Sequence, residues 1–342
     1  SLRGGWLAAG RFAEAREVLE TWSDAISMGM LPNRFQERGE APAYNSVDAS
    51  LWFVLATGEL LARTGVLSDA QQSRLSEAVR SVVERYAAGT RFGIRADGDG
   101  LLACGEAGTQ LTWMDAAVAR RPVTPRVGKP VEIQALWVNA LAVAASIDPR
   151  WSEPMARARE SFGVRFWSPS LGWLHDVVDC DHVPGTSDAS LRPNQIRAVG
   201  GLPVMLVEPS VAARVVAAVE ERLWTPMGLR TLAPGDARYV GRYEGDAVRR
   251  DASYHQGTAW PWLLAPFVEA WLRAHGATRE ARREARRRFL EPLVGWAREQ
   301  GFGHLPEIAD GDAPHAARGC PFQAWSVAAA LQIERVLRED AA

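Results

Sequence analysis

The sequence predicts an all-α fold in which pairs of helices form a ring, an α/α toroid of six hairpins. Two patterns support this prediction. Apolar helical segments alternate along the chain with more polar ones, as expected for the inner and outer helices of a ring. Long loops precede only the apolar member of each pair, and short turns follow it. The long loops would therefore gather on one face.

Each helical segment is indicated by apolar residues at helical spacing. In the first full segment Phe12, Ala15, Leu19 and Trp22 recur at this spacing. Ser68 is a good N-cap for the third segment. The expected helices are 11–28, 48–64, 68–88, 131–147, 150–166, 193–207, 210–223, 258–275, 278–300 and 320–339, with a helical stub at 1–9.

The connections between these helices are of two kinds. Short breaks contain Gly or Pro, as in Asp148-Pro149 and Glu208-Pro209. Loops as long as the others are usually functional within a compact domain. A β-hairpin is expected at 96–100, where the chain reads Ala-Asp-Gly-Asp-Gly. The long loops are 29–47, 89–130, 167–192, 224–257 and 301–319.

The helix count predicts an incomplete ring. With the stub there are six inner helices but only five outer ones. We therefore expect a single domain over residues 1–342 that lacks its first outer helix and part of its first inner helix. The apolar sides left without a neighbour would favour self-association. An open solenoid of hairpins is the alternative, although solenoid repeats are normally shorter and more regular than these units.

Composition excludes several classes of function. The net charge is -2 and the pI about 6.3, which points to neither nucleic acid nor an anionic membrane as partner. No stretch approaches 18 uninterrupted apolar residues, and the N-terminus has no signal-peptide core. Cys104, Cys180 and Cys320 are odd in number and widely spaced. This pattern is typical of a protein in the reducing cytoplasm.

The 14 tryptophans exceed what an ordinary core requires. Tryptophan stacks on the apolar face of a sugar, so the excess favours a carbohydrate ligand even though most of these residues would pack in the core. No cofactor or metal is expected. The chain has no phosphate-binding Gly-rich loop, and the spacing of His175, Cys180 and His182 fits no standard metal site.

Two carboxylates stand out in the long loops. Asp115 lies in the segment Leu-Thr-Trp-Met-Asp-Ala at 111–116, and Glu307 lies in Leu-Pro-Glu-Ile at 305–308. Both segments are too irregular to be helical, and both place the acid beside apolar or aromatic residues. They could present two carboxylates across a pocket. On spacing alone, Asp115 could equally be a turn or cap residue, and Asp310 or Asp312 could replace Glu307 as a base.

Eight blocks of the sequence strongly resemble the glucosidase domain of glycogen debranching enzymes. The resemblance runs from about residue 1 to 335, and it implies an (α/α)6 barrel of the glucoamylase type with amylo-α-1,6-glucosidase activity. In such domains a Trp-Gly-Arg-Asp-Thr-like segment leads into the helix that matches 1–9, and here it would lie before residue 1. The blocks are 32–35, 44–52, 111–116, 124–137, 191–195, 254–262, 305–308 and 319–326.

The resemblance also implies roles for the two carboxylates. Inverting hydrolysis of a glycoside uses one protonated acid on the departing oxygen and one carboxylate that activates water. The resemblance assigns Asp115 as the general acid and Glu307 as the general base. Trp113, Trp260 and Trp262 are expected to form walls. The residues expected to bind sugar hydroxyls are Arg34, Asp48, Lys129, Glu132, Asn194, Gln195, His255 and Gln256.

Some of these residues have structural alternatives. Asp48 could cap its helix, Glu132 could interact with the helix dipole, and His255 could make only a structural hydrogen bond. The expected substrate is glycogen or its limit dextrin, cleaved at single α-1,6-linked glucose stubs. The alternatives are another exo-acting α-glucosidase, a non-catalytic module that binds glycogen or maltooligosaccharides, and a helical scaffold for protein partners.

Overall fold

The computed structural model describes residues 2–34 and 41–338. Three parts of the expected organisation lie outside these ranges: residue 1 of the stub, residues 35–40 of the first long loop, and residue 339 of the last helix. In the described ranges, no helix is both long enough and apolar enough to cross a membrane.

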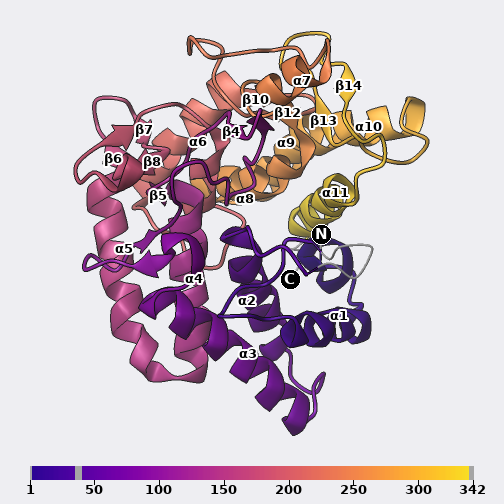
Figure 1. Cartoon of the computed structure of the whole chain (residues 1–342). Helices are drawn as coiled ribbons and strands as arrows, with labels where there is room; N and C mark the ends of the chain where they lie inside the picture. The colour runs from indigo at the N-terminus through magenta and orange to yellow at the C-terminus, as the bar shows by residue number, and fades with distance from the viewer. Residues whose placement is uncertain (1, 35–40, 339–342) are drawn as a thin grey trace.

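Helices dominate the structure (Figure 1). Elements labelled η are 3-10 turns, except η1 and η7, which are π-helical. The helical elements are η1 Arg3–Leu7, α1 Phe12–Asp24, α2 Asp48–Leu61, α3 Asp69–Ala88, η2 Arg91–Gly93, α4 Val131–Ile147, η3 Pro149–Trp151, α5 Ser152–Phe166, η4 Cys180–His182, η5 Pro193–Ala198, α6 Pro209–Leu223, α7 Ala247–Ser253, η6 Pro261–Leu263, α8 Leu264–Ala274, α9 Arg279–Ala285, η7 Arg286–Leu290, α10 Glu291–Glu299 and α11 Ala324–Arg338.

Short antiparallel strands occupy the long loops. They form one sheet in the order β10-β11-β12-β13-β14, one in the order β5-β8-β9, and three two-stranded hairpins. The hairpin expected at 96–100 is confirmed, because Ala96 pairs with Leu102. The strands are β1 Arg95–Ala96, β2 Leu102–Ala103, β3 Ala117–Val118, β4 Arg121–Pro122, β5 Lys129–Pro130, β6 Trp167–Ser168, β7 Trp173–Leu174, β8 Val177–Val178, β9 Ser187–Asp188, β10 Trp224–Thr225, β11 Gly228–Arg230, β12 Ala259–Trp260, β13 Ile308–Ala309 and β14 Ala317–Arg318.

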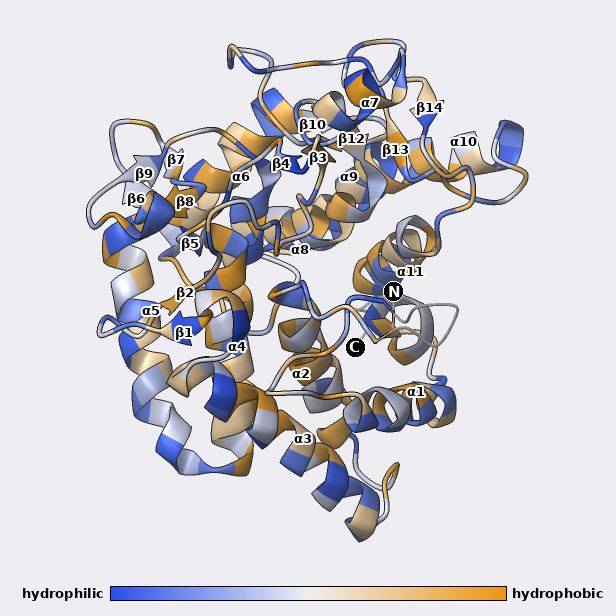
Figure 2. Ribbon diagram, viewed as in Figure 1, coloured by the Kyte–Doolittle hydropathy of each residue, from blue (hydrophilic) through white to orange (hydrophobic). Residues whose placement is uncertain are grey.

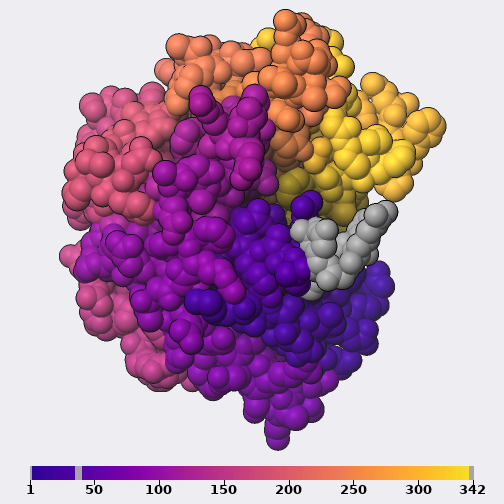
Figure 3. Space-filling view, in the orientation of Figure 1, coloured from indigo at the N-terminus to yellow at the C-terminus, as the bar shows by residue number. Residues whose placement is uncertain are grey.

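The inner elements contact one another in chain order around the molecule. Element η1 contacts α2, α2 contacts α4, α4 contacts η5, and η5 contacts α8. Helix α8 then contacts α11, and α11 contacts η1. The N-terminal and C-terminal regions accordingly adjoin on the face shown in Figure 3. Among the described helices, α1, α3, α5, α6 and α9 pack outside this series.

Burial separates inner from outer helices as the sequence predicted. In α4 every residue from Val131 to Leu141 is buried, whereas α5 buries only Ala158, Phe162 and Phe166. Figure 2 shows hydrophilic residues along α3 and α5 at the periphery. Ser68 caps α3 as expected, because its side chain accepts a hydrogen bond from the Gln71 backbone.

The expected helices 11–28 and 320–339 are shorter in the structure, α1 ending at Asp24 and α11 beginning at Ala324, and two other expected helices differ more. The segment 193–207 is not an α-helix: it forms the 3-10 element η5 and then turns from residue 199. Gly200, Gly201 and Pro203 all disfavour a continued helix. Residues 258–263 also stay outside α8, because β12 pairs with its neighbours and Pro261 favours an extended residue before it. Helix α7 was not expected at all.

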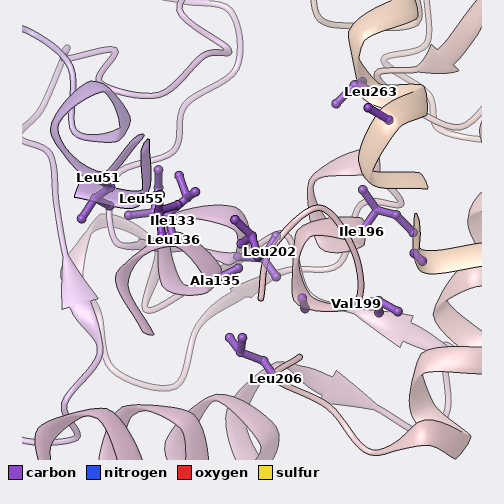
Figure 4. Packing of buried hydrophobic residues seen from close by; sticks show 14 of the residues in the cluster. Leu51, Leu55, Ile133, Ala135, Leu136, Ile196, Val199, Leu202, Leu206 and Leu263 are labelled. Atoms are coloured by element: carbon purple, nitrogen blue, oxygen red, sulfur yellow. The ribbon is translucent and has the colours of Figure 1, made fainter. Parts of the chain in front are cut away.

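The irregular segment 199–207 nevertheless contributes to the core. Figure 4 shows Leu202 beside Ala135 of α4 and Val199 near Ile196 of η5, with Leu206 in the same cluster. All three side chains are at most 3% exposed. Burial of apolar area therefore fixes this segment without regular backbone hydrogen bonding.

Helices α2 and α4 approach closely at Gly58. A Cβ atom on Gly58 would lie 2.6 Å from Cγ2 of Val143 and 2.8 Å from its Cγ1. Because these two helices carry Asp48 and Glu132 in their first turns, their spacing also sets the distance between two candidate site residues.

We expect Gly58→Ala to destabilise the protein, although alanine ordinarily stabilises a helix interior by about 0.5–1 kcal/mol relative to glycine. Overpacking against Val143 typically costs about 1–3 kcal/mol and should outweigh that gain. Urea unfolding would measure the change. The double variant Gly58→Ala/Val143→Ala should recover part of the loss. An increase in unfolding free energy for Gly58→Ala alone would contradict the close packing.

Candidate active site

A pocket of about 560 Å³ opens among the long loops and runs inward between the inner elements. Asp48 and Glu132 begin its helical walls, and Trp52, Leu136 and Ala56 continue them one or two turns further along α2 and α4. The pocket brings together nine of the predicted site residues: Asp48, Trp113, Asp115, Glu132, Asn194, His255, Trp260, Trp262 and Glu307.

Asp115 reaches the pocket from a loop that two hydrogen bonds anchor just before it. The Val47 amide donates to the Leu111 carbonyl at 2.8 Å, and the indole Nε1 of Trp113 donates to Asn194 Oδ1 at 2.8 Å. Asp115 is exposed to the open pocket, yet the pocket walls crowd its carboxyl group. This partial burial raises the pKa of Asp115, and the negative charge of Asp48 raises it further.

Glu307 is positioned by strand pairing next to it and by hydrogen bonds to its carboxylate. It directly precedes β13, which pairs with β12 on one side and β14 on the other. Its carboxylate accepts hydrogen bonds from the Cys320 amide at 3.1 Å and from Gln323 Nε2 at 3.3 Å. Gly319 has φ +67, and a Cβ there would lie 2.5 Å from Glu307 Oε2. Glycine is therefore needed beside this carboxylate.

Tyr254 contacts Glu307, and the charge of Asp115 also acts on its hydroxyl group. No sequence pattern had given Tyr254 a role. Burial raises the pKa of the Tyr254 hydroxyl, and contact with Glu307 and the charge of Asp115 raise it further. Tyr254 also lines the pocket. Tyr254 is the first residue of the block 254–262, and its membership of that block was the only sequence feature that could have marked it as a site residue.

Tryptophans form much of the wall. Trp113 packs edge-on against Trp260 and Trp262, with ring centroids 5.3 and 5.1 Å apart. Trp262 stacks on Trp325 at 5.7 Å. Trp325 and Trp52 line the pocket although the sequence analysis gave them no role. These flat apolar surfaces beside carboxylates suit a ligand with both apolar and hydroxylated faces.

His255 is fully buried against Trp260. Burial lowers the pKa of His255 to about 3, and the charges of Arg192 and Arg126 add to this effect. Neither ring nitrogen has a hydrogen-bond partner among the described residues. The imidazole is therefore neutral at ordinary pH and cannot act as a cationic acid.

Four predicted sugar-binding residues lie away from the pocket lining. Arg34 is exposed and forms a β-bridge with Ala43. Lys129 is buried, and its ammonium lies within 3.1 Å of carboxylate oxygens of Asp97, Asp99 and Asp179. The side chains of Gln195 and Gln256 are occupied by protein partners. The polar groups of the last three residues therefore serve contacts within the protein, because they are already bonded.

Glu132 belongs to a buried ionic network rather than offering a free carboxylate. Arg126 donates to both of its oxygens, at 2.5 and 2.6 Å. Arg126 Nε also lies 3.2 Å from Asp176 Oδ2, close enough for an ion pair but not aligned for a hydrogen bond. Burial raises the pKa of Glu132, and the charge of Arg126 opposes that rise.

The network continues into the walls of the pocket. Asp176 Oδ1 accepts from Asn194 Nδ2 at 2.8 Å, and Asn194 in turn accepts from Trp113. Arg192 lies 3.8 Å from Asp176 and donates to the His255 carbonyl at 2.9 Å. Asn194 thus positions Trp113, because both ends of its amide are occupied.

No group of three or more His, Cys, Asp or Glu residues within the described ranges is arranged to hold a metal ion. The three cysteines are free thiols.

A family model described as amylo-alpha-1,6-glucosidase matches residues 1–332. The chain belongs to the amylo-alpha-1,6-glucosidase family. It is thus a member of a glycoside hydrolase family, as the sequence blocks suggested. The chain is 25% identical to the glycogen debranching enzyme of Saccharomyces cerevisiae over 97% of its own length, but it spans only 28% of that enzyme.

Solved structures confirm the predicted fold. A GH63 mannosylglycerate hydrolase from Thermus thermophilus, in complex with Tris and D-glycerate, matches with a TM-score of 0.63. The two chains are 17% identical over 97% of this chain and 91% of that one. A rhamnosidase from Klebsiella oxytoca with rhamnose bound matches with a TM-score of 0.56 and 15% identity, over 92% of this chain and 52% of that one. At these identities the likeness shows the fold alone.

We expect Arg126→Met to destabilise the protein by about 3–5 kcal/mol, since it leaves Glu132 and Asp176 buried without their partner. The pKa of Glu132 should then rise further above that of the unfolded chain. The folded state would hold more protons than the unfolded state, so stability should fall as pH rises from about 5 to about 8.

Thermal unfolding of the Arg126→Met variant at both ends of this pH range would test the prediction. Arg150→Met, which removes an exposed ion pair with Glu84, is the matched control and should change stability little. Equal destabilisation of Arg126→Met at both pH values would contradict the proposed network electrostatics.

Proposed function

We propose that this chain is an inverting amylo-α-1,6-glucosidase that removes single α-1,6-linked glucose units from a trimmed glycogen branch. The observation that supports it most directly is the meeting of Asp115 and Glu307 in one tryptophan-lined pocket. The family match and the similarity to the yeast glycogen debranching enzyme support the choice of substrate. We infer that residues 1–342 act as one glucosidase domain; its cytoplasmic location and its self-association remain predictions.

In the proposed reaction Asp115 is the general acid. Burial and the charge of Asp48 raise the pKa of Asp115 and so favour its protonated form, and this proton passes to the glycosidic oxygen as the bond to C1 breaks. Glu307 is the general base. It accepts a proton from water while the water oxygen bonds to C1 from the opposite face, so the released glucose has inverted anomeric configuration.

The residues around Asp115 and Glu307 suit their proposed roles as general acid and general base. The carboxylate of Glu307 accepts hydrogen bonds from two N–H donors, which hold it in position to receive a proton from water. Asp115 has apolar and aromatic neighbours and the charge of Asp48 nearby, which disfavour its ionised form. No metal or cofactor is required in this scheme, because acid, base and water supply every proton and bond.

Glucose release from phosphorylase-limit dextrin tests the proposal. We expect Asp115→Asn and Glu307→Gln each to lower the rate at least about 100-fold, because each removes one partner of the acid–base pair. Glu77→Gln, on the exposed face of α3, is the control. If the unaltered protein binds the dextrin but releases no glucose, a non-catalytic binding module is favoured. Release only from other α-glucosides would favour another exo-acting glucosidase.

The pH profile provides a separate test of the acid. Activity should decline on the alkaline side as Asp115 loses its proton. Since the charge of Asp48 raises the pKa of Asp115, Asp48→Asn should lower that pKa and move the alkaline limb to lower pH, by up to about one unit. A profile of kcat/KM against pH would measure this shift. A limb that stays in place or moves to higher pH would exclude Asp115 as the group that Asp48 controls.

A further inference from the structure

One buried cation in the pocket has no partner among the described residues. Arg197, in η5, is only 7% exposed and lines the pocket beside Trp52 and Trp262. Its side chain makes no hydrogen bond and no ion pair with any residue in the ranges 2–34 and 41–338, in contrast to Arg126 and Arg192 nearby. Its N–H donors therefore remain available to a molecule in the pocket.

Two tryptophans hold this guanidinium group in place. Its carbon lies 4.7 Å from the ring centroid of Trp52 and 5.1 Å from that of Trp262. Such cation–π contacts stabilise a charge without using its hydrogen-bond donors. The group is fixed, but its five donors are not satisfied.

Burying the guanidinium group of Arg197 without a hydrogen-bond partner lowers the stability of the protein when no ligand is bound. Burial lowers the pKa of Arg197 to about 9, and the charge of Arg3 adds to this effect, whereas the charges of Glu269 and Glu132 oppose it. A buried charge without a partner destabilises a fold. Groups of this kind cluster at functional sites, where a ligand supplies the missing interaction.

The position of Arg197 indicates which part of a ligand it meets. Asp115 and Glu307 line the pocket from two of the long loops. Trp52, which contacts Arg197, lies one turn further along α2 than Asp48. A glycosyl unit whose C1 lies between Asp115 and Glu307 would therefore point its opposite edge inward. In a hexopyranose the 4-hydroxyl group lies on that edge.

Pocket charge favours a neutral acceptor over an anion. Asp48 and Glu307 line the same cavity, and they would repel a carboxylate or phosphate more than a hydroxyl group. Arg3 also lines the cavity, but it is already paired with Glu59. Hydroxyl oxygens accept hydrogen bonds from a guanidinium group without adding charge.

We propose that Arg197 is a specificity-determining residue that binds the 4-hydroxyl edge of the terminal glucosyl unit. The inference rests on the proposed function and extends it. A unit that carries a further sugar on its 4-hydroxyl group could not present that edge to Arg197, so the site would select single-glucose stubs over longer branches.

The test compares the binding of glucose and 4-deoxyglucose, measured by calorimetry or by tryptophan fluorescence. We expect the unaltered protein to bind glucose about 10- to 100-fold more tightly, as for a hydrogen bond to a charged group. Arg197→Met should lose this preference, and Arg197→Lys should keep part of it. Arg222→Met, which removes a cation over Trp173 outside the pocket, should bind both sugars normally.

Thermal unfolding separates this role from a structural one. Because Arg197 carries a buried charge that no described residue pairs, Arg197→Met should leave the Tm unchanged or raise it. A lower Tm with equal loss of both sugars would overturn the proposal, as would the absence of any preference in the unaltered protein. So would much tighter binding of glucose 6-phosphate or glucuronate, lost in Arg197→Met, because it would identify an anion site.

Binding requires no hydrolysis, so the two proposals can fail separately. A protein that prefers glucose to 4-deoxyglucose through Arg197, yet releases no glucose from limit dextrin, would retain this inference and lose the proposed function.

Discussion

The buried ionic network around Arg126 is the interaction on which the acid side of the pocket depends. Arg126 and Arg192 face Glu132 and Asp176, so two positive and two negative groups share one interior volume. Removing one member would leave its partner charged and buried, which is far less favourable than the intact set. The network therefore holds α4 and two long loops in one fixed relation.

From this network, hydrogen bonds extend to the reacting groups. Asp176 holds Asn194, Asn194 holds Trp113, and Trp113 lies two residues before Asp115. The base side is built independently, through the pairing of β12, β13 and β14 around Glu307. Because different contacts position Asp115 and Glu307, the two carboxylates can have different surroundings. A crowded aromatic wall favours the protonated form of Asp115, and two N–H donors hold the carboxylate of Glu307 in place.

Much of the fold could be predicted from the sequence, because apolar periodicity reports burial directly. The alternation of α2 with α3 and of α4 with α5 followed from that pattern. It failed at 193–207, where the residues are apolar but Gly200, Gly201 and Pro203 prevent a continuous helix. There the pattern correctly reported burial, since Val199 and Leu202 are in the core, and wrongly suggested helical hydrogen bonding.

For the site, the order of residues along the chain is enough to show which loops carry carboxylates and tryptophans, and its blocks identify the family. Which polar groups stay free depends on contacts that form only in the folded protein. Lys129, Gln195 and Gln256 look like ligand-binding residues in sequence, yet protein partners occupy them. Arg197 looks like an ordinary helix residue, yet no residue of the described chain pairs with it. The reason is physical: a polar group is available to a ligand only if the fold leaves its hydrogen bonds unmade, and those partners come from residues distant in the chain.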